Sequence, residues 1–225
     1  MASQFHDMDL FGIIGIGRFG QALVMELLKN GKNVIALDNN AQKLESIKKY
    51  VNQVYLIDQM RHDALAEAGI GACGTVIVCI GKDIENNLLA TLNAKELGVP
   101  RVISKASSAD HGRLLEKLGA EVVIPEEDMG KRLAQSLCRT NTLEWLPLCE
   151  DFSIIETEVF SALDGKKVID LNLRKNYGIN IIAIVDSGKA NGTIGPDTIL
   201  KKGQNLVISG TNKNLAAFQK INTEN

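Results

Sequence analysis

The sequence predicts an α/β fold in which a Rossmann-like, doubly wound parallel sheet is followed by a second, small α+β domain. Unbroken apolar runs rich in Val and Ile alternate with helical segments, which is typical of parallel strands covered on both faces. Right-handed crossovers between such strands give the doubly wound topology. The predicted strands lie at residues 10–15, 33–38, 53–58, 75–81, 101–105 and 121–125.

The helical segments between these strands have recognisable ends. Three of them close on a glycine, which is the residue that best adopts the left-handed conformation of a helix C-terminal cap. Pro100 follows one of these glycines and cannot continue a helix. The capping glycines are Gly31, Gly98 and Gly119.

The pattern changes after Val122. Met129, Leu133 and Leu137 recur every four residues, which predicts a helix over about 126–138 with an apolar stripe. An apolar connector with Leu143, Trp145, Leu146 and Leu148 follows it. Two interpretations of the stripe stay open, namely packing against the helix's own sheet and contact with a second subunit.

The remaining chain predicts a separate domain. Its apolar runs lie at 153–160, 179–185 and 205–210, and an amphipathic helix closes it near 212–221. These elements are too few to extend the parallel sheet. We therefore expect a nucleotide-binding domain at 1–140 and a small α+β domain at 150–225, with a boundary near 140–150.

Composition places the chain among globular proteins. Its 225 residues are 45% hydrophobic and 23% charged, with a formal net charge of -2, which argues against disorder and against nucleic-acid binding. The longest stretch without Asp, Glu, Lys or Arg runs from Ala68 to Gly81, shorter than the roughly 20 apolar residues of a membrane span. Neither terminus carries a targeting signal, so we expect a cytoplasmic protein.

The cysteines and histidines show no spacing typical of a metal site. We expect reduced thiols and assign no metal cluster or nucleophile to either residue type. The residues concerned are Cys73, Cys79, Cys138, Cys149, His6, His62 and His111.

A glycine-rich turn between the first strand and the first helix predicts a nucleotide site. The segment Gly15-Ile16-Gly17-Arg18-Phe19-Gly20 is a GxGxxG motif in the strand–turn–helix context that gives the motif its meaning. The first glycine permits the turn, the second lets a diphosphate approach the backbone, and the third brings helix against strand. Backbone amides at the helix N-terminus then face the phosphates.

Two acidic residues follow neighbouring strands at the same edge. Asp38 ends the second strand and is placed to accept hydrogen bonds from ribose hydroxyls, whereas a 2′-phosphate would be repelled. Asp58, followed by Gln59, ends the third strand, where it would meet adenine or ribose. A helix cap for Asp38 and a turn for Asp58 are the purely structural alternatives.

Arg18 favours ATP or ADP over a dinucleotide, because its cation suits a terminal phosphate. A solvent-exposed arginine without a ligand is the alternative. The chain lacks the Tyr-xxx-Lys pair of single-domain dehydrogenases and the Gly-Lys-Ser/Thr sequence of phosphate-hydrolysing loops. It also offers no catalytic Ser/His or His/Asp set. We therefore expect a binding protein, not an enzyme.

The chain resembles the regulator-of-potassium-conductance family, specifically the cytosolic gating-ring subunits of Ktr and Trk potassium-uptake systems. One departure is that the family's frequent Gly-Asp-Ala at the third strand reads Ile57-Asp58-Gln59 here. The matching blocks are GIGRFG (15–20), NVIALD (33–38), DALAEAGI (63–70), VIVCIGKDIENNLLATLNAKELGVP (76–100), RLLEKLGAEVVIPEEDMGKRLAQSL (113–137) and VIDLNLRKNYGINIIAIV (168–185).

This resemblance implies roles for residues of the first domain. Arg18 matches an arginine that meets nucleotide phosphates, Asp38 the ribose ligand, and Lys105 a basic residue near the phosphates at a dimer interface. Glu126 matches a glutamate between paired nucleotides that helps to bind a divalent cation, Mg²⁺ or Ca²⁺. From the residues alone, an acidic first turn is favoured by the helix dipole without any ligand.

The resemblance also implies a second ligand and an assembly. In the C-terminal domain it implies a cyclic-di-AMP site across two subunits, with Arg174 and Asn180 as polar contacts and Ile169 and Pro196 as apolar walls. It implies dimerisation through a crossover helix near 126–146 and an octameric ring. The ring would lie at the inner face of the cell membrane, beneath a potassium transporter or channel subunit.

Our hypothesis is a cytosolic sensor that gates potassium uptake because nucleotides prefer one of two ring conformations. The rival is an NAD-dependent oxidoreductase or redox sensor on the same fold, with NAD or NADH as cofactor. A structural ring protein with a vestigial pocket is a third alternative.

Overall fold

The computed structural model describes residues 6–137 and 142–220. The chain divides into two compact units, Met1–Asp128 and Met129–Asn225. This division falls inside a helix, α6 (Pro125–Leu137), and differs from the limits of 140 and 150 expected from the sequence. Each unit is described by itself.

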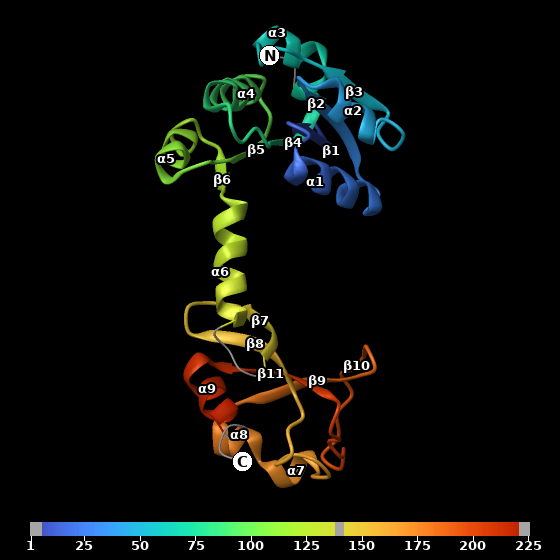
Figure 1. Ribbon diagram of the computed structural model, residues 1–225, viewed down its shortest axis with the longest axis vertical. Coiled ribbons are helices and arrows are strands. Elements are labelled where there is room, and N and C mark those ends of the chain that lie inside the picture. The colour runs from blue at the N-terminus through green and yellow to red at the C-terminus, as the bar shows by residue number, and fades with distance from the viewer. Residues whose placement is uncertain (1–5, 138–141, 221–225) are drawn as a thin grey trace. The chain divides into compact units, whose positions relative to one another are not determined.

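The first unit is built on a six-stranded parallel sheet with the strand order β3-β2-β1-β4-β5-β6 (Figure 1). The order reverses between β1 and β4, as in the doubly wound topology that the sequence predicts, which confirms the fold class. The strands are β1 (Asp7–Ile14), β2 (Asn33–Asp38), β3 (Gln53–Leu56), β4 (Cys73–Val78), β5 (Arg101–Lys105) and β6 (Glu121–Val123).

Helices cover both faces of this sheet, because successive side chains of a strand point to opposite faces. Ile14 packs in one core with residues of α3 and α4, whereas Ile13 packs in another with residues of α1 and α2. Figure 1 shows these two pairs of helices on opposite sides of the strands. The helices are α1 (Arg18–Lys29), α2 (Ala41–Ile47), α3 (His62–Glu67), α4 (Ile84–Glu96) and α5 (Ala109–Lys117), with a 3-10 turn η1 at Ile70–Ala72.

The predicted glycine caps are confirmed. Gly31, Gly98 and Gly119 follow the C-terminal residues of α1, α4 and α5, and each has a positive φ between 73° and 80°. A side chain at these positions would be strained, so glycine fixes where each helix turns back toward the sheet.

The second unit is a five-stranded antiparallel sheet with the strand order β10-β9-β11-β8-β7. Its core gathers around Phe218, whose ring centroid lies 5.5 Å from that of Phe160 and 5.6 Å from that of Tyr177. This confirms a small α+β domain. Its elements are β7 (Thr142–Pro147), β8 (Phe152–Glu158), α7 (Val168–Leu171), α8 (Leu173–Tyr177), β9 (Asn180–Asp186), β10 (Lys189–Asn191), β11 (Asn205–Thr211) and α9 (Asn212–Lys220).

The helix predicted over about 126–138 is confirmed as α6, but the longer crossover helix that the resemblance implied, near 126–146, is wrong. α6 ends at Leu137, and 142–147 form strand β7 where the sequence predicted an apolar connector. β7 pairs antiparallel with β8, with Trp145 opposite Ile155. The apolar residues there follow neither a helical nor an alternating period, so the pairing with β8 decides the structure.

Candidate nucleotide-binding site

The three glycines of the turn after β1 lie in different environments. Gly15 has φ +98°, and a Cβ on it would lie 3.0 Å from the backbone nitrogen of Ile80. A Cβ on Gly20 would lie only 2.1 Å from the carbonyl oxygen of Gly15, so α1 packs directly on the turn. A Cβ on Gly17 would meet nothing within 4 Å. The turn is therefore packed at its two ends and open at its middle.

The N-terminus of α1 is built to receive an anion. Gly17 caps the helix without a side-chain hydrogen bond, and no acidic residue lies in the first turn. The backbone amides of such a turn have no intrahelical partner and carry the positive end of the helix dipole. Arg18 is exposed beside them and makes no ion pair within the residues that the structure describes.

Asp38 is buried at the carboxyl end of β2, with only 3% of its surface exposed. One carboxylate oxygen accepts a hydrogen bond from the backbone N–H of Ile16 at 2.6 Å, and the other accepts one from Asn40 at 2.9 Å. The ammonium group of Lys43 lies 3.2 Å from both oxygens. Asp38 therefore ties the glycine turn to the start of α2. It does not cap that helix, because Asn40 is the N-cap residue.

The sequence did not predict the position of Lys43, because no motif includes it. A signal was present, since Lys43 lies in the first turn of a helix capped by Asn40, close to the end of β2. It supplies a cation beside Asp38, whose charge alone would repel a 2′-phosphate.

Asp58 and Gln59 lie beyond the end of β3, which stops at Leu56. Leu56 pairs with Asp38, and the backbone N–H of Ile57 donates to the Asp38 carbonyl at 3.1 Å. Both predicted residues are exposed at the same edge of the sheet as Asp38. Their contact with adenine or ribose stays a prediction.

Lys105 and Glu126 form an ion pair at this edge. Lys105 ends β5 and its ammonium lies 2.5 Å from a carboxylate oxygen of Glu126, in the first turn of α6. The same ammonium lies 5.9 Å from the centroid of the Phe19 ring. The hydrogen bond from Lys105, and to a smaller extent the charge of Arg18, hold the pKa of Glu126 below its ordinary range. The structure thus brings together the residues after β1, at the end of β5 and at the start of α6.

The ion pair between Lys105 and Glu126 occupies the carboxylate for which a divalent cation was predicted. Among the described residues, no group of three or more His, Cys, Asp or Glu side chains is placed to hold a metal ion. Glu126 is the one residue for which we predicted a metal role, and its carboxylate contacts Lys105. Binding of Mg²⁺ or Ca²⁺ there stays a prediction.

Neither Cys79, which follows β4 at the edge of the candidate site, nor Cys73, at the opposite end of β4, has the character of a reactive thiol. Burial raises the pKa of Cys79, which follows β4, to about 12, although the charge of Lys105 opposes the shift. Burial likewise raises the pKa of Cys73 to about 12. A redox-sensing thiol needs a lowered pKa and access to solvent, and these two have neither.

The four residues expected to hold a second ligand lie on the second unit, and all four are exposed. The backbone N–H of Ile169 donates to the carbonyl of Pro196 at 3.0 Å, so these two predicted apolar walls are in contact. Arg174 lies on α8 and Asn180 begins β9. Whether the four share one ligand stays a prediction.

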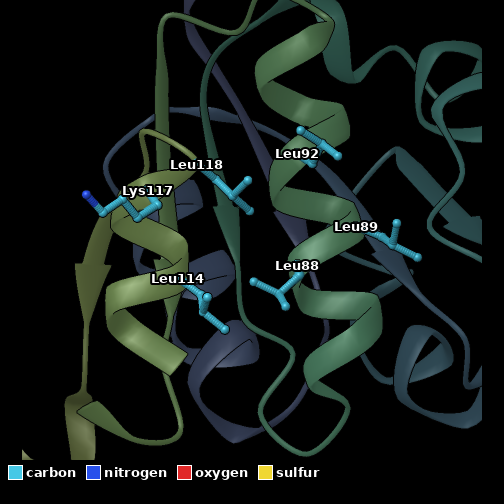
Figure 2. A pocket seen from close by; sticks show the side chains of 6 residues that line it. All are labelled: Leu88, Leu89, Leu92, Leu114, Lys117 and Leu118. Carbon is cyan, nitrogen blue, oxygen red and sulfur yellow. The ribbon is translucent and has the colours of Figure 1, made fainter. Parts of the chain in front are cut away.

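An apolar groove of about 270 Å³ lies between α4 and α5, and none of its lining residues is a predicted nucleotide ligand. Figure 2 shows Leu88 of α4 and Leu114 of α5 pointing toward one another across it, while the amine of Lys117 points outward. A surface without polar groups in its depth suits a protein side chain better than a nucleotide. Its lining residues are Leu88, Leu89, Leu92, Leu114, Lys117 and Leu118.

Comparison with known proteins identifies the family. The TrkA-N domain model matches residues 11–126, and the TrkA-C domain model matches residues 156–222. The Ktr system potassium uptake protein A of Bacillus subtilis (strain 168) is 37% identical over 210 residues, covering 93% of this chain and 95% of that protein. This chain belongs to the Ktr/TrkA family of potassium uptake proteins. The resemblance found in the sequence is thereby confirmed.

Other Ktr/TrkA relatives agree with this assignment. The Ktr system potassium uptake protein A of Vibrio alginolyticus is 33% identical over 207 residues, covering 92% of this chain and 94% of that protein. Among solved structures, the GsuK channel bound to NAD shares the fold, with a TM-score of 0.63 at 21% identity, covering 97% of this chain and 39% of that one. Within the described part of the Ktr/TrkA chain, no helix has the length and apolar composition to cross a bilayer.

Proposed function

We propose that this chain is a cytoplasmic, non-catalytic regulatory subunit that binds ATP or ADP at the glycine turn and thereby gates a Ktr- or Trk-type membrane potassium transporter or channel. The observation that carries the proposal is the open N-terminus of α1, which begins at Arg18 and has the ammonium of Lys105 near the ring of Phe19. Amides and two cations suit the phosphates of a nucleotide. Asp38 suits its ribose.

The preference for ATP or ADP rests on charge. The adenosine diphosphate part is common to ATP, ADP and NADH, so the turn and Asp38 serve all three. Arg18 and Lys105 add positive charge, which is worth most to a terminal phosphate. NAD or NADH is the alternative ligand. Because the NAD-bound GsuK channel shares this fold, both are included in the experiment below.

A thermal-melt panel on the full chain tests this proposal. ATP, ADP, NAD, NADH and cyclic-di-AMP are compared on the wild type and on Arg18→Ala, with and without Mg²⁺ or Ca²⁺. A ligand at about 100 times its Kd adds roughly 2.7 kcal/mol of stability to the folded state. We expect ATP and ADP to raise the melting temperature of the wild type. Arg18→Ala should reduce the stabilisation by ATP more than the stabilisation by NADH. Stabilisation by NADH alone would overturn the proposal and favour the oxidoreductase or redox-sensor alternative.

The gating step needs its own readout. Potassium flux is measured in proteoliposomes that contain a Ktr-type membrane subunit, with and without this chain. We expect flux to depend on the chain and to differ between ATP and ADP, because a ligand shifts a conformational equilibrium only if its affinity differs between the two states. Equal flux with both nucleotides would contradict nucleotide gating.

We further propose a cyclic-di-AMP site on the second unit. The backbone hydrogen bond between Ile169 and Pro196 supports it, because it holds two exposed apolar residues next to one another. The neighbouring Arg174 and Lys175 are basic and suit a phosphodiester. In the melt panel, Arg174→Ala should abolish stabilisation by cyclic-di-AMP and leave that by ATP unchanged.

We also propose assembly of copies into a dimer and then a ring, with an octamer as the expected size. The stripe on α6 supports the dimer contact, because Met129, Leu133 and Leu137 are 61%, 56% and 77% exposed. A ring needs a second contact surface beyond that of the dimer. The groove between α4 and α5 offers one.

A further inference from the structure

The side chain of Asn87, in α4, links the ends of two neighbouring strands. It is completely buried, at 0% exposure. Its amide nitrogen donates to the carbonyl of Ile80 at 2.7 Å and to the carbonyl of Lys105 at 3.1 Å. Ile80 follows β4, and Lys105 ends β5. One amide group thus holds the carboxyl ends of both strands.

Buried hydroxyl groups fix the orientation of this amide. The hydroxyl of Ser104 donates to the side-chain oxygen of Asn87 at 3.0 Å. The hydroxyl of Thr91 lies 3.0 Å from that of Ser104 and 2.8 Å from the backbone carbonyl oxygen of Asn87. All three residues are fully buried. Because the polar atoms of Asn87 are satisfied in a medium of low dielectric, the network specifies a single arrangement.

Both strand ends held by Asn87 border the candidate nucleotide site. The backbone nitrogen of Ile80 lies 3.0 Å from the position of a Cβ on Gly15, so Ile80 packs against the glycine turn. The side chain of Lys105 extends from the other strand end toward Glu126 and Phe19. Asn87 therefore fixes the backbone from which this lysine projects relative to the turn.

We propose that Asn87 is a positioning residue for nucleotide phosphates, which holds Lys105 in place without touching the ligand. This inference rests on the proposed function. A charged donor contributes fully only when it is already oriented toward its acceptor. Lys105 would contact the outer phosphates, which AMP lacks. Loss of Asn87 should therefore weaken the binding of ATP more than the binding of AMP.

The test compares two leucine variants of the same helix by calorimetric titration of the full chain with ATP and with AMP. Asn87→Leu removes the donors to Ile80 and Lys105. Asn93→Leu is the matched control, because buried Asn93 donates instead to the carbonyl of Met60 at 2.6 Å. Both variants remove a donor from backbone carbonyls and should lower the melting temperature. We expect only Asn87→Leu to raise the Kd of ATP, by about tenfold, with the Kd of AMP nearly unchanged.

Two further variants keep the test decisive. Ser104→Ala removes only the hydroxyl that orients Asn87, and we expect the same selective loss to a smaller degree even if Asn87→Leu does not fold. In a Lys105→Met background, Asn87→Leu and Ser104→Ala should have no further effect on the ratio of the two Kd values.

The outcomes separate this inference from the proposed function. If the wild type binds no nucleotide, both are overturned. If Lys105→Met weakens ATP but Asn87→Leu and Ser104→Ala leave the ratio unchanged, or shift ATP and AMP equally, only the positioning role is overturned. The same holds if their effects persist without Lys105.

Discussion

The carboxylate of Asp38 links the glycine turn to the start of α2, and it also lies at the candidate site. Each oxygen accepts a backbone N–H, and both lie near Lys43. A carboxylate has about four acceptor positions, so ribose hydroxyls have room if Lys43 moves aside. The sequence predicted the position of Asp38 at the strand end, but not the lysine that covers it.

Lys43→Gln should sharpen recognition of ribose. The variant frees Asp38 from an ion pair that ribose hydroxyls have to displace. We expect the ratio of the Kd for 2′-deoxy-ATP to that for ATP to rise about 1.4- to fivefold, since a partly exposed ion pair contributes about 0.2–1 kcal/mol. Calorimetric titration measures both values. An unchanged ratio would show that Lys43 does not compete with the ribose.

The thiols should differ in reactivity. At pH 8 iodoacetamide should modify the exposed Cys149 and leave Cys73 and Cys79 intact, because these two are buried and their pKa values are raised to about 12. Both remain protonated until the pH approaches those values. Mass mapping of peptides gives the extent of modification, and unfolding in guanidinium exposes all sites as a control. Rapid native modification of Cys79 would revive the redox-sensor alternative.

At the scale of elements, the first sheet was predictable because each strand is an apolar run bounded by a turn signal. β2 and β5 have the predicted limits, and the other strands shift by a few residues at their ends. β7 was not predictable, because its residues become a strand only by pairing with β8. Long-range pairing is invisible to local periodicity, and so are the contacts that Lys43 and Asn87 make across elements.

The junction of β1 and α1 provides a matched pair of glycine variants. Gly20→Ala forces a methyl group to within 2.1 Å of the Gly15 carbonyl, so we expect a loss of stability of about 1–3 kcal/mol or more. Gly17→Ala meets open space at φ -83° and should keep the melting temperature. It should nevertheless weaken the binding of ATP, because the methyl group lies where a diphosphate would approach. Calorimetry and titration separate the two effects, and a stable Gly20→Ala would contradict the packing described here.

At the scale of the whole molecule, the two exposed apolar surfaces should form different contacts between copies. The stripe on α6 should form the dimer, and the groove between α4 and α5 should join dimers into a ring. Leu133→Glu places a charge in the stripe on α6 and should reduce the species to a protomer. Leu114→Glu places one in the groove between α4 and α5 and should stop assembly at the dimer. Light scattering after size exclusion gives the mass of each variant. Lys117→Glu, at the rim of the same groove, is the milder control. Wild-type mass in both leucine variants would contradict these contacts.

Glu126 and the exposed stripe belong to one helix, since α6 begins at Pro125 and carries Met129, Leu133 and Leu137 farther along. A nucleotide that takes Lys105 away from Glu126 therefore acts on the same element through which we propose that copies associate. Such coupling between two binding events is reciprocal. Dilution of the protein should then change its apparent affinity for ATP, and a Kd measured on nanomolar chain should differ from one measured on micromolar chain.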